Sequence, residues 1–206
     1  TALQGSFAIA VVGRREDDKL ALVAREHYGW LTPVQVYETA SSVLRAVTDG
    51  TASVALLPLP SREDVEPWWR LIARAGKETP RIIARLPFAQ PAVPEVEALA
   101  VSRAPNEATG QDRSFLVLEA SGELSMSTIR RRLQAAGLEV LDIQNWGEGA
   151  HRLHLVEVEG FLAEDAPTLE DLVAEEIEQA FVVGGYAVPL SAQELAPAKE
   201  LVGEAS

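Results

Sequence analysis

Residues 53–64 read SVALLPLPSRED, and this stretch decides how the first half of the chain folds. The apolar run 53–57 is typical of a buried strand, and Pro58 and Pro60 end it before the polar residues 61–64. In open α/β sheets, ligands bind in the loops that follow the carboxyl ends of the strands. The stretch therefore predicts an α/β sheet with a candidate binding loop directly after one of its strands.

Strand-like and helix-like segments alternate on both sides of this stretch. We expect strands at 7–13, 33–37, 53–57 and 81–88, amphipathic helices at 15–29, 39–47 and 63–76, and one more strand at 98–103. In the third helix, Val65, Trp68, Trp69 and Ile72 are expected on or near the inner face. A β-α-β-α-β-α-β order predicts parallel strands joined by right-handed crossovers.

The second half of the chain follows a different pattern. We expect strands at 113–120, 138–146, 151–161 and 182–190, and helices at 126–136 and 167–181. This βαββαβ order is the ferredoxin-like pattern. Small and polar residues at 104–112 predict a boundary between an α/β domain at 6–104 and a second domain at 112–190. The polar, alanine-rich tail at 191–206 is expected to be partly disordered.

Composition excludes several classes of protein. The chain has 206 residues, no cysteine and a formal net charge of −13, so we expect no disulfide, and no nucleic acid or anionic membrane as a partner. No apolar run approaches the ~20 residues of a membrane-spanning helix, and no signal-peptide pattern opens the chain. The expected location is the cytoplasm.

The two halves together resemble the prephenate dehydratase family with its C-terminal ACT regulatory domain. The segment VQVYETASSVLRAVTDGTASVALLPLP (34–60) is similar to the dehydratase segment that leads into the active-site loop. The segments SGELSMSTIRRRLQAAGLEVLDIQNW (121–146) and LHLVEVEGF (153–161) are similar to the ACT domain. The opening TALQGSFAIAVVG (1–13) resembles the linker that follows a chorismate mutase helix in bifunctional proteins, which implies such a domain before Thr1.

The catalytic motifs of the family are not matched. Where the family has Pro-apolar-Glu-Asn-Ser, this chain has Pro58-Leu59-Pro60-Ser61-Arg62, and the Thr-Arg-Phe motif has no counterpart. The stretch between Phe88 and Gln111 is too short for the second α/β lobe of a dehydratase. We therefore predict a reduced, periplasmic-binding-type half domain and no catalytic residue. Arg14 and Arg62 are possible anion contacts at strand ends, or else solvated loop arginines.

The resemblance to ACT domains also implies a binding site. Such domains usually bind a small amino acid between two copies, through the turn after the first strand and the end of the second. The matching positions here are Gly122, Glu123 and Leu124 in the turn and Ile143, Gln144 and Asn145 in the strand. The implied partners are a second copy of the chain and phenylalanine or a related amino acid. An ACT fold kept only for dimerisation stays open as an alternative.

No cofactor or metal is expected. His151 and His154 are three residues apart in a predicted strand and so point to opposite faces. The predicted function is a non-catalytic regulatory and dimerisation region in phenylalanine and tyrosine biosynthesis, attached to a chorismate mutase. The alternatives are an active prephenate dehydratase with displaced catalytic residues and a structural interaction module without a ligand.

Overall fold

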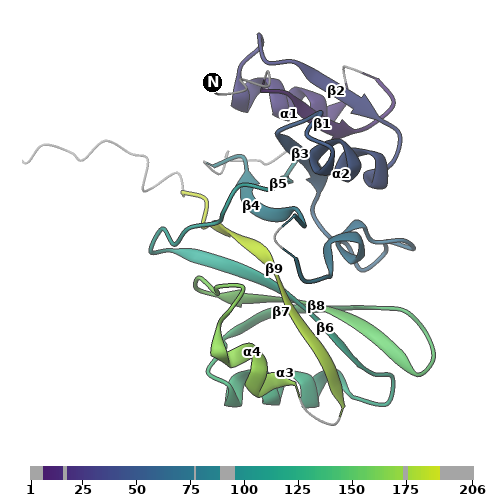
Figure 1. The fold of residues 1–206 in the computed structure, drawn as a ribbon, viewed down its shortest axis with the longest axis vertical. Helices are drawn as coiled ribbons and strands as arrows, with labels where there is room; N and C mark the ends of the chain where they lie inside the picture. The colour runs from purple at the N-terminus through teal and green to yellow at the C-terminus, as the bar shows by residue number, and fades with distance from the viewer. Residues whose placement is uncertain (1–6, 16–17, 77, 89–95, 174–175, 191–206) are drawn as a thin grey trace, which may run out of the picture.

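The computed structural model describes residues 7–15, 18–76, 78–88, 96–173 and 176–190. These residues build one nine-stranded sheet with the strand order β2-β1-β3-β5-β4-β9-β6-β8-β7, and helices lie against its faces (Figure 1). The mixed α/β class is therefore confirmed. The predicted tail at 191–206 lies outside the described residues.

The N-terminal half, strands β1 to β5, begins as an α/β unit. Its elements are β1 (Ile9–Val12), α1 (Lys19–Tyr28), β2 (Val34–Tyr37), α2 (Ala40–Thr48), β3 (Val54–Pro58), η1 (Trp68–Ile72), β4 (Arg81–Leu86) and β5 (Ala98–Ser102). Strand β1 pairs in parallel with β2 and with β3, as the sequence predicts. Strand β5 lies between β3 and β4 and is antiparallel to both, so β3 and β4 still run in the same direction.

The helix expected at 63–76 is wrong. Only a 3-10 helix forms there, η1, and the expected inner residue Val65 is 86% exposed. Pro67 lies directly before η1, and a proline disfavours a helical conformation in the residue that precedes it, so a longer α-helix cannot run through this point. Trp68, Trp69 and Ile72 are nevertheless buried, as the pattern predicted.

The C-terminal half, strands β6 to β9, has the ferredoxin-like arrangement. Its elements are β6 (Asp112–Ser121), α3 (Met126–Ala135), β7 (Val140–Trp146), β8 (His151–Glu159), α4 (Pro167–Leu172) and β9 (Ile177–Ala187). The antiparallel order β9-β6-β8-β7 places the first and last strands of the unit side by side. Helices α3 and α4 both lie on the lower side of these strands in Figure 1.

The helix expected at 167–181 is also wrong in its length. It ends at Leu172, and Ile177, which was expected on its inner face, begins the 11-residue strand β9. Strand β9 pairs with β6 along nearly its whole length. This long-range pairing outweighs the local helical pattern, because intrinsic propensity is a weak preference that tertiary contacts override.

One contact joins the two halves into a single sheet. Ile82 of β4 pairs in parallel with Gly184 of β9. Gly184 has a φ of +116°, and a Cβ atom there would lie 2.1 Å from the carbonyl oxygen of Ile82. Only glycine fits this position, since any side chain would meet both an unfavourable φ and the neighbouring backbone. The predicted boundary at 104–112 falls largely on the loop between β5 and β6.

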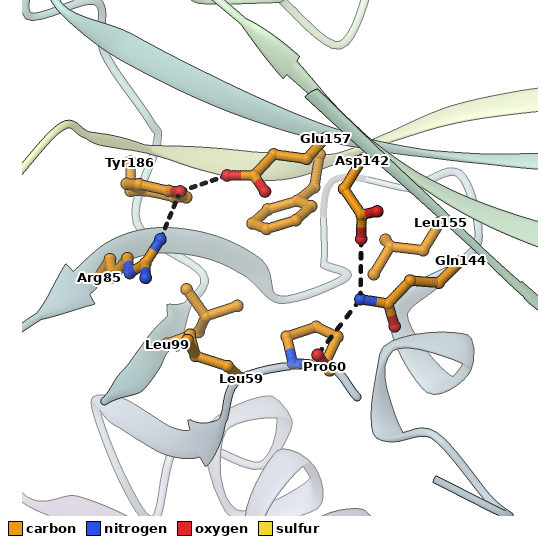
Figure 2. Close-up of a pocket in the computed structure, with 10 residues that line it drawn as sticks. Leu59, Pro60, Arg85, Leu99, Asp142, Gln144, Leu155, Glu157 and Tyr186 are labelled. Atoms are coloured by element: carbon orange, nitrogen blue, oxygen red, sulfur yellow. Dashed lines mark hydrogen bonds between the residues drawn. The ribbon is translucent and has the colours of Figure 1, made fainter. Parts of the chain in front are cut away.

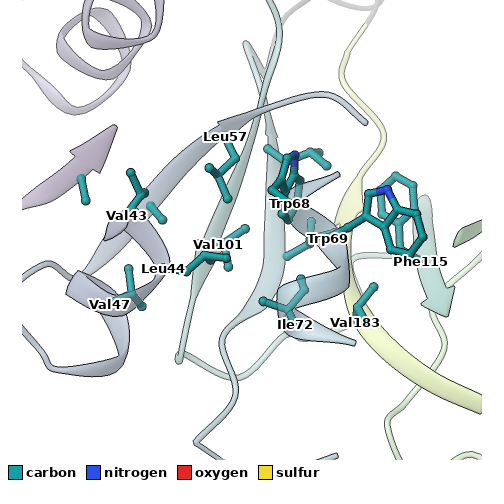
Figure 3. Packing of buried hydrophobic residues seen from close by; sticks show 14 of the residues in the cluster. Val43, Leu44, Val47, Leu57, Trp68, Trp69, Ile72, Val101, Phe115 and Val183 are labelled. Atoms are coloured by element: carbon teal, nitrogen blue, oxygen red, sulfur yellow. The ribbon is translucent and has the colours of Figure 1, made fainter. Parts of the chain in front are cut away.

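A hydrophobic core spans both halves. Trp68, Trp69 and Ile72 of η1 pack between the α2–β3–β5 side of the N-terminal half and residues of β6, β8 and β9 (Figure 3). Strand residues alternate as expected: Leu57 enters this cluster, and its neighbour Leu56 packs with α1 on the opposite face. A separate cluster lies between α3, α4 and the C-terminal strands. Among the described residues, no helix is long and apolar enough to span a membrane.

Candidate ligand site between the two halves

The carboxyl ends of β1 and β3 lead into two polar loops, the positions at which open α/β sheets usually bind ligands. In the loop after β1, the backbone N–H groups of Arg14 and Arg15 both donate to the carboxylate of Asp18. These two hydrogen bonds lower the pKa of Asp18. The backbone donors that would suit a bound carboxylate are therefore occupied by the chain's own carboxylate, and the side chain of Arg14 is exposed.

The loop after β3 is closed in the same way. The N–H of Ser61 donates to the Asp64 carboxylate over 3.0 Å, and the N–H of Glu63 donates to the Ser61 hydroxyl over 3.2 Å. The side chain of Arg62, 66% exposed, forms an ion pair with Asp142 of β7. Arg62 therefore links this loop to the C-terminal half, and its charge already has a partner.

A pocket of about 180 Å³ lies where the end of β3 meets the C-terminal strands. We call it the interface pocket, because the N-terminal half contributes four lining residues and the C-terminal half six. The lining residues are Leu59, Pro60, Arg85, Leu99, Phe115, Asp142, Gln144, Leu155, Glu157 and Tyr186 (Figure 2). Five of them form an apolar wall, and the other five carry polar groups. A small molecule with an apolar body and one or two polar groups suits such a lining.

A chain of hydrogen bonds crosses the pocket. Arg85 donates from Nη1 to the hydroxyl of Tyr186 over 3.1 Å, and Tyr186 donates to Glu157 (Figure 2). On its other side, Arg85 donates from Nε and Nη2 to Glu97, at 3.2 and 2.8 Å. Arg85, Tyr186 and Glu157 lie on strands β4, β9 and β8, so these three groups are held by the sheet rather than by a loop.

Burial and hydrogen bonding together set the protonation states of Tyr186 and Arg85. Tyr186 is 2% exposed, and burial, together with the hydrogen bond to Glu157, raises its pKa, so the phenol keeps its proton at neutral pH. Burial alone would lower the pKa of Arg85, but its hydrogen bonds with Tyr186 and Glu97 outweigh burial and raise it. Arg85 therefore stays charged, and Tyr186 stays a neutral donor.

Gln144 adds an amide to the pocket. Its Nε2 donates to the carbonyl oxygen of Pro60 over 3.3 Å and to Asp142 over 3.2 Å. Both partners are acceptors, which fixes the orientation of the amide, since the opposite orientation would place its oxygen against two other oxygens. The Oε1 atom is then buried without a hydrogen-bond partner among the described residues. A buried acceptor without a donor is costly.

The six residues that were expected to bind an effector have different surroundings within one copy of the chain. Leu124 and Ile143 are buried in the core beneath α3 and α4. Glu123 and Asn145 are exposed, and Gln144 lies in the interface pocket. Gly122 packs against the turn between β7 and β8, since a Cβ atom there would lie 2.0 Å from the carbonyl oxygen of Gly149. Within one copy of the chain, Gln144 is thus the one member of the six that lines this pocket.

The histidines lie on opposite faces of β8, as the strand alternation predicts. His151 is exposed, with its Nδ1 atom 2.8 Å from Glu178, whereas His154 is 2% exposed. Burial, with a smaller contribution from the charge of Arg152, lowers the pKa of His154 to about 4. Among the described residues, Glu119, His151 and Glu178 bring ligand atoms within 4.8 Å of one another. This group is largely exposed, and exposed carboxylates often gather without a metal.

Sequence reasoning missed most of the interface pocket. Arg85, Glu157 and Tyr186 are far apart in the sequence and meet only through the order of the strands. The available signal was a charged residue inside an otherwise apolar strand, as in RIIARLPF (81–88) and LHLVEVEGF (153–161). Charged side chains in such positions are either solvated or functional, and the local pattern does not distinguish the two.

Comparison with known proteins identifies the fold. No family model matches the chain, and no curated protein matches it. Among solved structures, GqqA, described as a novel type of quorum quenching acylase, matches with a TM-score of 0.65 and 20% identity over 87% of this chain and 94% of that one. Prephenate dehydratase from Streptococcus mutans matches with a TM-score of 0.61 and 14% identity, over 88% of this chain and 98% of that one. The enzyme from Arthrobacter aurescens, solved in complex with L-Phe, gives 0.61 and 14%, over 87% and 90%.

The chain has a prephenate dehydratase-like fold. At these identities the likeness concerns the fold alone, and it confirms the resemblance noted in the sequence at that level. Within the prephenate dehydratase-like fold, this chain places β5 as the single described element between β4 and β6. The polar groups that lie where a ligand could bind are those of the interface pocket and of the loops after β1 and β3.

Proposed function

We propose that the chain binds a small metabolite of aromatic amino-acid biosynthesis in the interface pocket and acts as a regulatory region. The observation that carries this proposal is the lining of the pocket, which comes from both halves of the molecule. A ligand that contacts both halves favours one packing of Leu59 and Leu99 against Phe115 and Leu155. Binding would then be coupled to the relative position of the halves, which is what a regulatory region requires.

Two features support regulation over catalysis. The loops after β1 and β3 use their polar groups on the chain's own carboxylates, Asp18 and Asp64. Elimination of a hydroxyl group from prephenate needs a proton donor for the leaving group. The Thr-Arg-Phe motif that supplies the catalytic threonine in the resembling family has no counterpart in this sequence.

The proposal includes a homodimer and an attached chorismate mutase. Dimerisation through the C-terminal half is supported by the ferredoxin-like arrangement and by the resemblance to ACT domains. In such a dimer, the turn at Gly122 and the exposed Asn145 would face the second copy. Light scattering over a range of concentrations tests the dimer, and a concentration-independent monomer would remove this part of the proposal.

The central experiment measures ligand binding. Calorimetry and thermal unfolding with L-Phe, L-Tyr, L-Trp and prephenate are expected to detect at least one ligand, because binding to the folded state alone raises its stability. Leu59→Phe is expected to fill part of the pocket and weaken that binding. Leu31→Phe is the matched control, since Leu31 is 100% exposed. Absence of binding by the whole panel would overturn the proposal.

The same preparation tests catalysis directly. Incubation with prephenate followed by detection of phenylpyruvate separates a regulatory region from an active dehydratase. We expect no turnover above the uncatalysed rate. Turnover at an enzyme-like rate would overturn the regulatory reading and support the dehydratase alternative.

A second candidate function is hydrolysis of an acyl amide. It is favoured by the fold match to GqqA and by the hydrogen bond between Tyr186 and Glu157 beside an apolar wall. A carboxylate of this kind can take a proton from water, and a phenol can give one to a leaving amine. Release of primary amine from a panel of N-acyl amides tests this activity. Glu157→Gln should abolish it, and Glu159→Gln, which removes an exposed carboxylate from the same strand, should not.

A further inference from the structure

The charges that line the interface pocket are unevenly neutralised. Arg85 forms an ion pair with Glu97 at 2.8 Å, and Asp142 forms one with Arg62. Both of these lining charges therefore already have a close partner of opposite sign. Glu157 is the third charged residue of the lining and does not have such a partner.

Glu157 lies between weaker partners. Its nearest guanidinium is that of Arg113, whose Nη1 lies 3.8 Å from Oε1, and Arg113 is shared with Glu159 at 3.7 Å. The hydroxyl of Tyr186 donates to the same oxygen, Oε1. Among the described residues, Oε2 accepts no hydrogen bond; this oxygen is not fully buried, so solvent reaches it, and the side chain as a whole is 17% exposed. A partly buried carboxylate in this position gains much from a cationic donor.

The other groups in the pocket suit the same kind of ligand. The ring of Phe115 also lines the pocket, 5.9 Å from that of Tyr186, and an aromatic face attracts a cation. The face of Tyr186 is already covered by the Arg85 guanidinium, 5.6 Å from the ring centroid, so Phe115 is the ring that a ligand would contact. The apolar wall would contact the body of the ligand. At about 180 Å³, the pocket is smaller than the roughly 300 Å³ at which drug-sized sites begin.

We propose that the interface pocket recognises a primary ammonium group carried on a small apolar body, with Glu157 as its direct partner. An aromatic or aliphatic amine, or an amino acid, belongs to this class. A molecule that carries carboxylates and no amine, such as prephenate or phenylpyruvate, is disfavoured because it would face Glu157 and Asp142. This inference rests on the proposed function only in requiring that the pocket binds a small molecule.

A set of matched ligands tests the inference on the unaltered protein. Phenethylamine has the ammonium group without a carboxylate, 3-phenylpropionate has the carboxylate without an ammonium group, and L-Phe has both. We expect phenethylamine and L-Phe to bind at least tenfold more tightly than 3-phenylpropionate in calorimetry. Equal or tighter binding of 3-phenylpropionate would overturn the inference and leave the proposed function standing. Binding by none of the three would overturn the inference, and extending that result to the full metabolite panel would overturn the proposed function too.

Two variants then locate the contact. Glu157→Gln removes the charge but keeps an acceptor for Tyr186, and it should weaken phenethylamine at least tenfold. Glu159→Gln removes the same charge two residues away, where the side chain is 48% exposed, and should change the affinity less than twofold. This control separates a direct contact from the general attraction of a cation to a chain with a net charge of −13. Equal effects of the two substitutions would overturn the role of Glu157.

Discussion

The two halves of the molecule differ in how completely their carboxylates are paired. In the N-terminal half, the strand-end loops hold their own carboxylates: Asp18 accepts from the amides of Arg14 and Arg15, and Asp64 accepts from Ser61. In the C-terminal half, Glu157 presents a partly buried carboxylate that is incompletely paired. The loops where an α/β protein usually binds its ligand are closed, and the open polar group lies on the C-terminal strands of the same sheet.

This difference makes the junction of the halves the most informative part of the molecule. Arg85 and Leu59 meet Glu157 and Tyr186 only because β4 lies next to β9.

The largest effect is expected for Gly184→Ala. The added Cβ would lie 2.1 Å from the carbonyl oxygen and 2.4 Å from the nitrogen of Ile82, so β4 and β9 must separate. We expect a loss of more than about 3 kcal/mol in the free energy of unfolding. Denaturant titration followed by circular dichroism measures it.

Gly110→Ala is the matched control for this prediction. Gly110 also has a positive φ, +102°, but nothing lies within 4 Å of its Cβ position. It should lose only the roughly 1–2 kcal/mol that a left-handed conformation costs a residue with a side chain. Equal losses for the two variants would mean that the halves are not joined through Ile82 and Gly184.

The next largest effect is expected for Trp69→Ala. Trp69 is 1% exposed and packs in the cluster that contains residues of both halves. Truncation of a buried tryptophan typically costs about 3–5 kcal/mol. Trp30→Ala removes the same side chain from a position that is 67% exposed, and should cost less than about 0.5 kcal/mol. Comparable losses in urea titrations of the two variants would contradict a shared core at η1.

The sequence predicts those parts of this architecture that depend on local pattern. The strand at 53–57, the alternation of Leu56 and Leu57, and the burial of Trp68 and Trp69 follow from periodicity, which burial imposes directly. The antiparallel insertion of β5 and the long strand β9 depend on pairing between distant segments. The helical spacing of Leu169, Leu172 and Ile177 therefore predicts too long a helix, because Ile177 pairs with β6 as part of a strand instead of extending α4.

For the candidate site too, the sequence predicts what depends on local pattern and not what depends on contacts between distant residues. The expected loop arginines, Arg14 and Arg62, are identified by position, but their neighbours Asp18 and Asp142 determine whether they are available. Asp18 is close in sequence and could have been considered as a partner. Asp142 is 80 residues from Arg62, and only the strand order brings the two together.

A smaller effect is expected at His154, within the C-terminal half. Burial holds its pKa at about 4, below the unfolded value near 6.5, so the unfolded chain binds the extra proton first. The stabilisation is complete above about pH 6.5 and is lost as the pH falls towards 4. A shift of this size contributes roughly 2 kcal/mol after an allowance for solvent screening.

His154→Leu should remove most of that pH dependence. Both ring nitrogens of His154 lack a hydrogen-bond partner among the described residues, so the variant should also be about 1 kcal/mol more stable at pH 7. Melting temperatures between pH 4 and 7.5 measure both effects. A weaker dependence remains from His27, whose pKa burial also lowers.

The smallest effect is expected for the ion pair that links the halves at the rim of the pocket. Arg62 and Asp142 are 66% and 36% exposed, and exposed pairs typically contribute about 0.2–1 kcal/mol. A double-mutant cycle with Arg62→Ala and Asp142→Ala should give a coupling in this range that shrinks in about 1 M salt. Arg103 and Glu78, an exposed pair within the N-terminal half, serve as the reference cycle.

A coupling above about 2 kcal/mol would mean that the rim is dry and rigid in solution, so that a ligand could enter only by breaking this pair. A coupling equal to the reference would mean that this pair joins the halves no more strongly than an ordinary exposed ion pair, so that the hydrogen bond from Gln144 to Pro60 and the apolar wall hold the loop after β3 at the pocket.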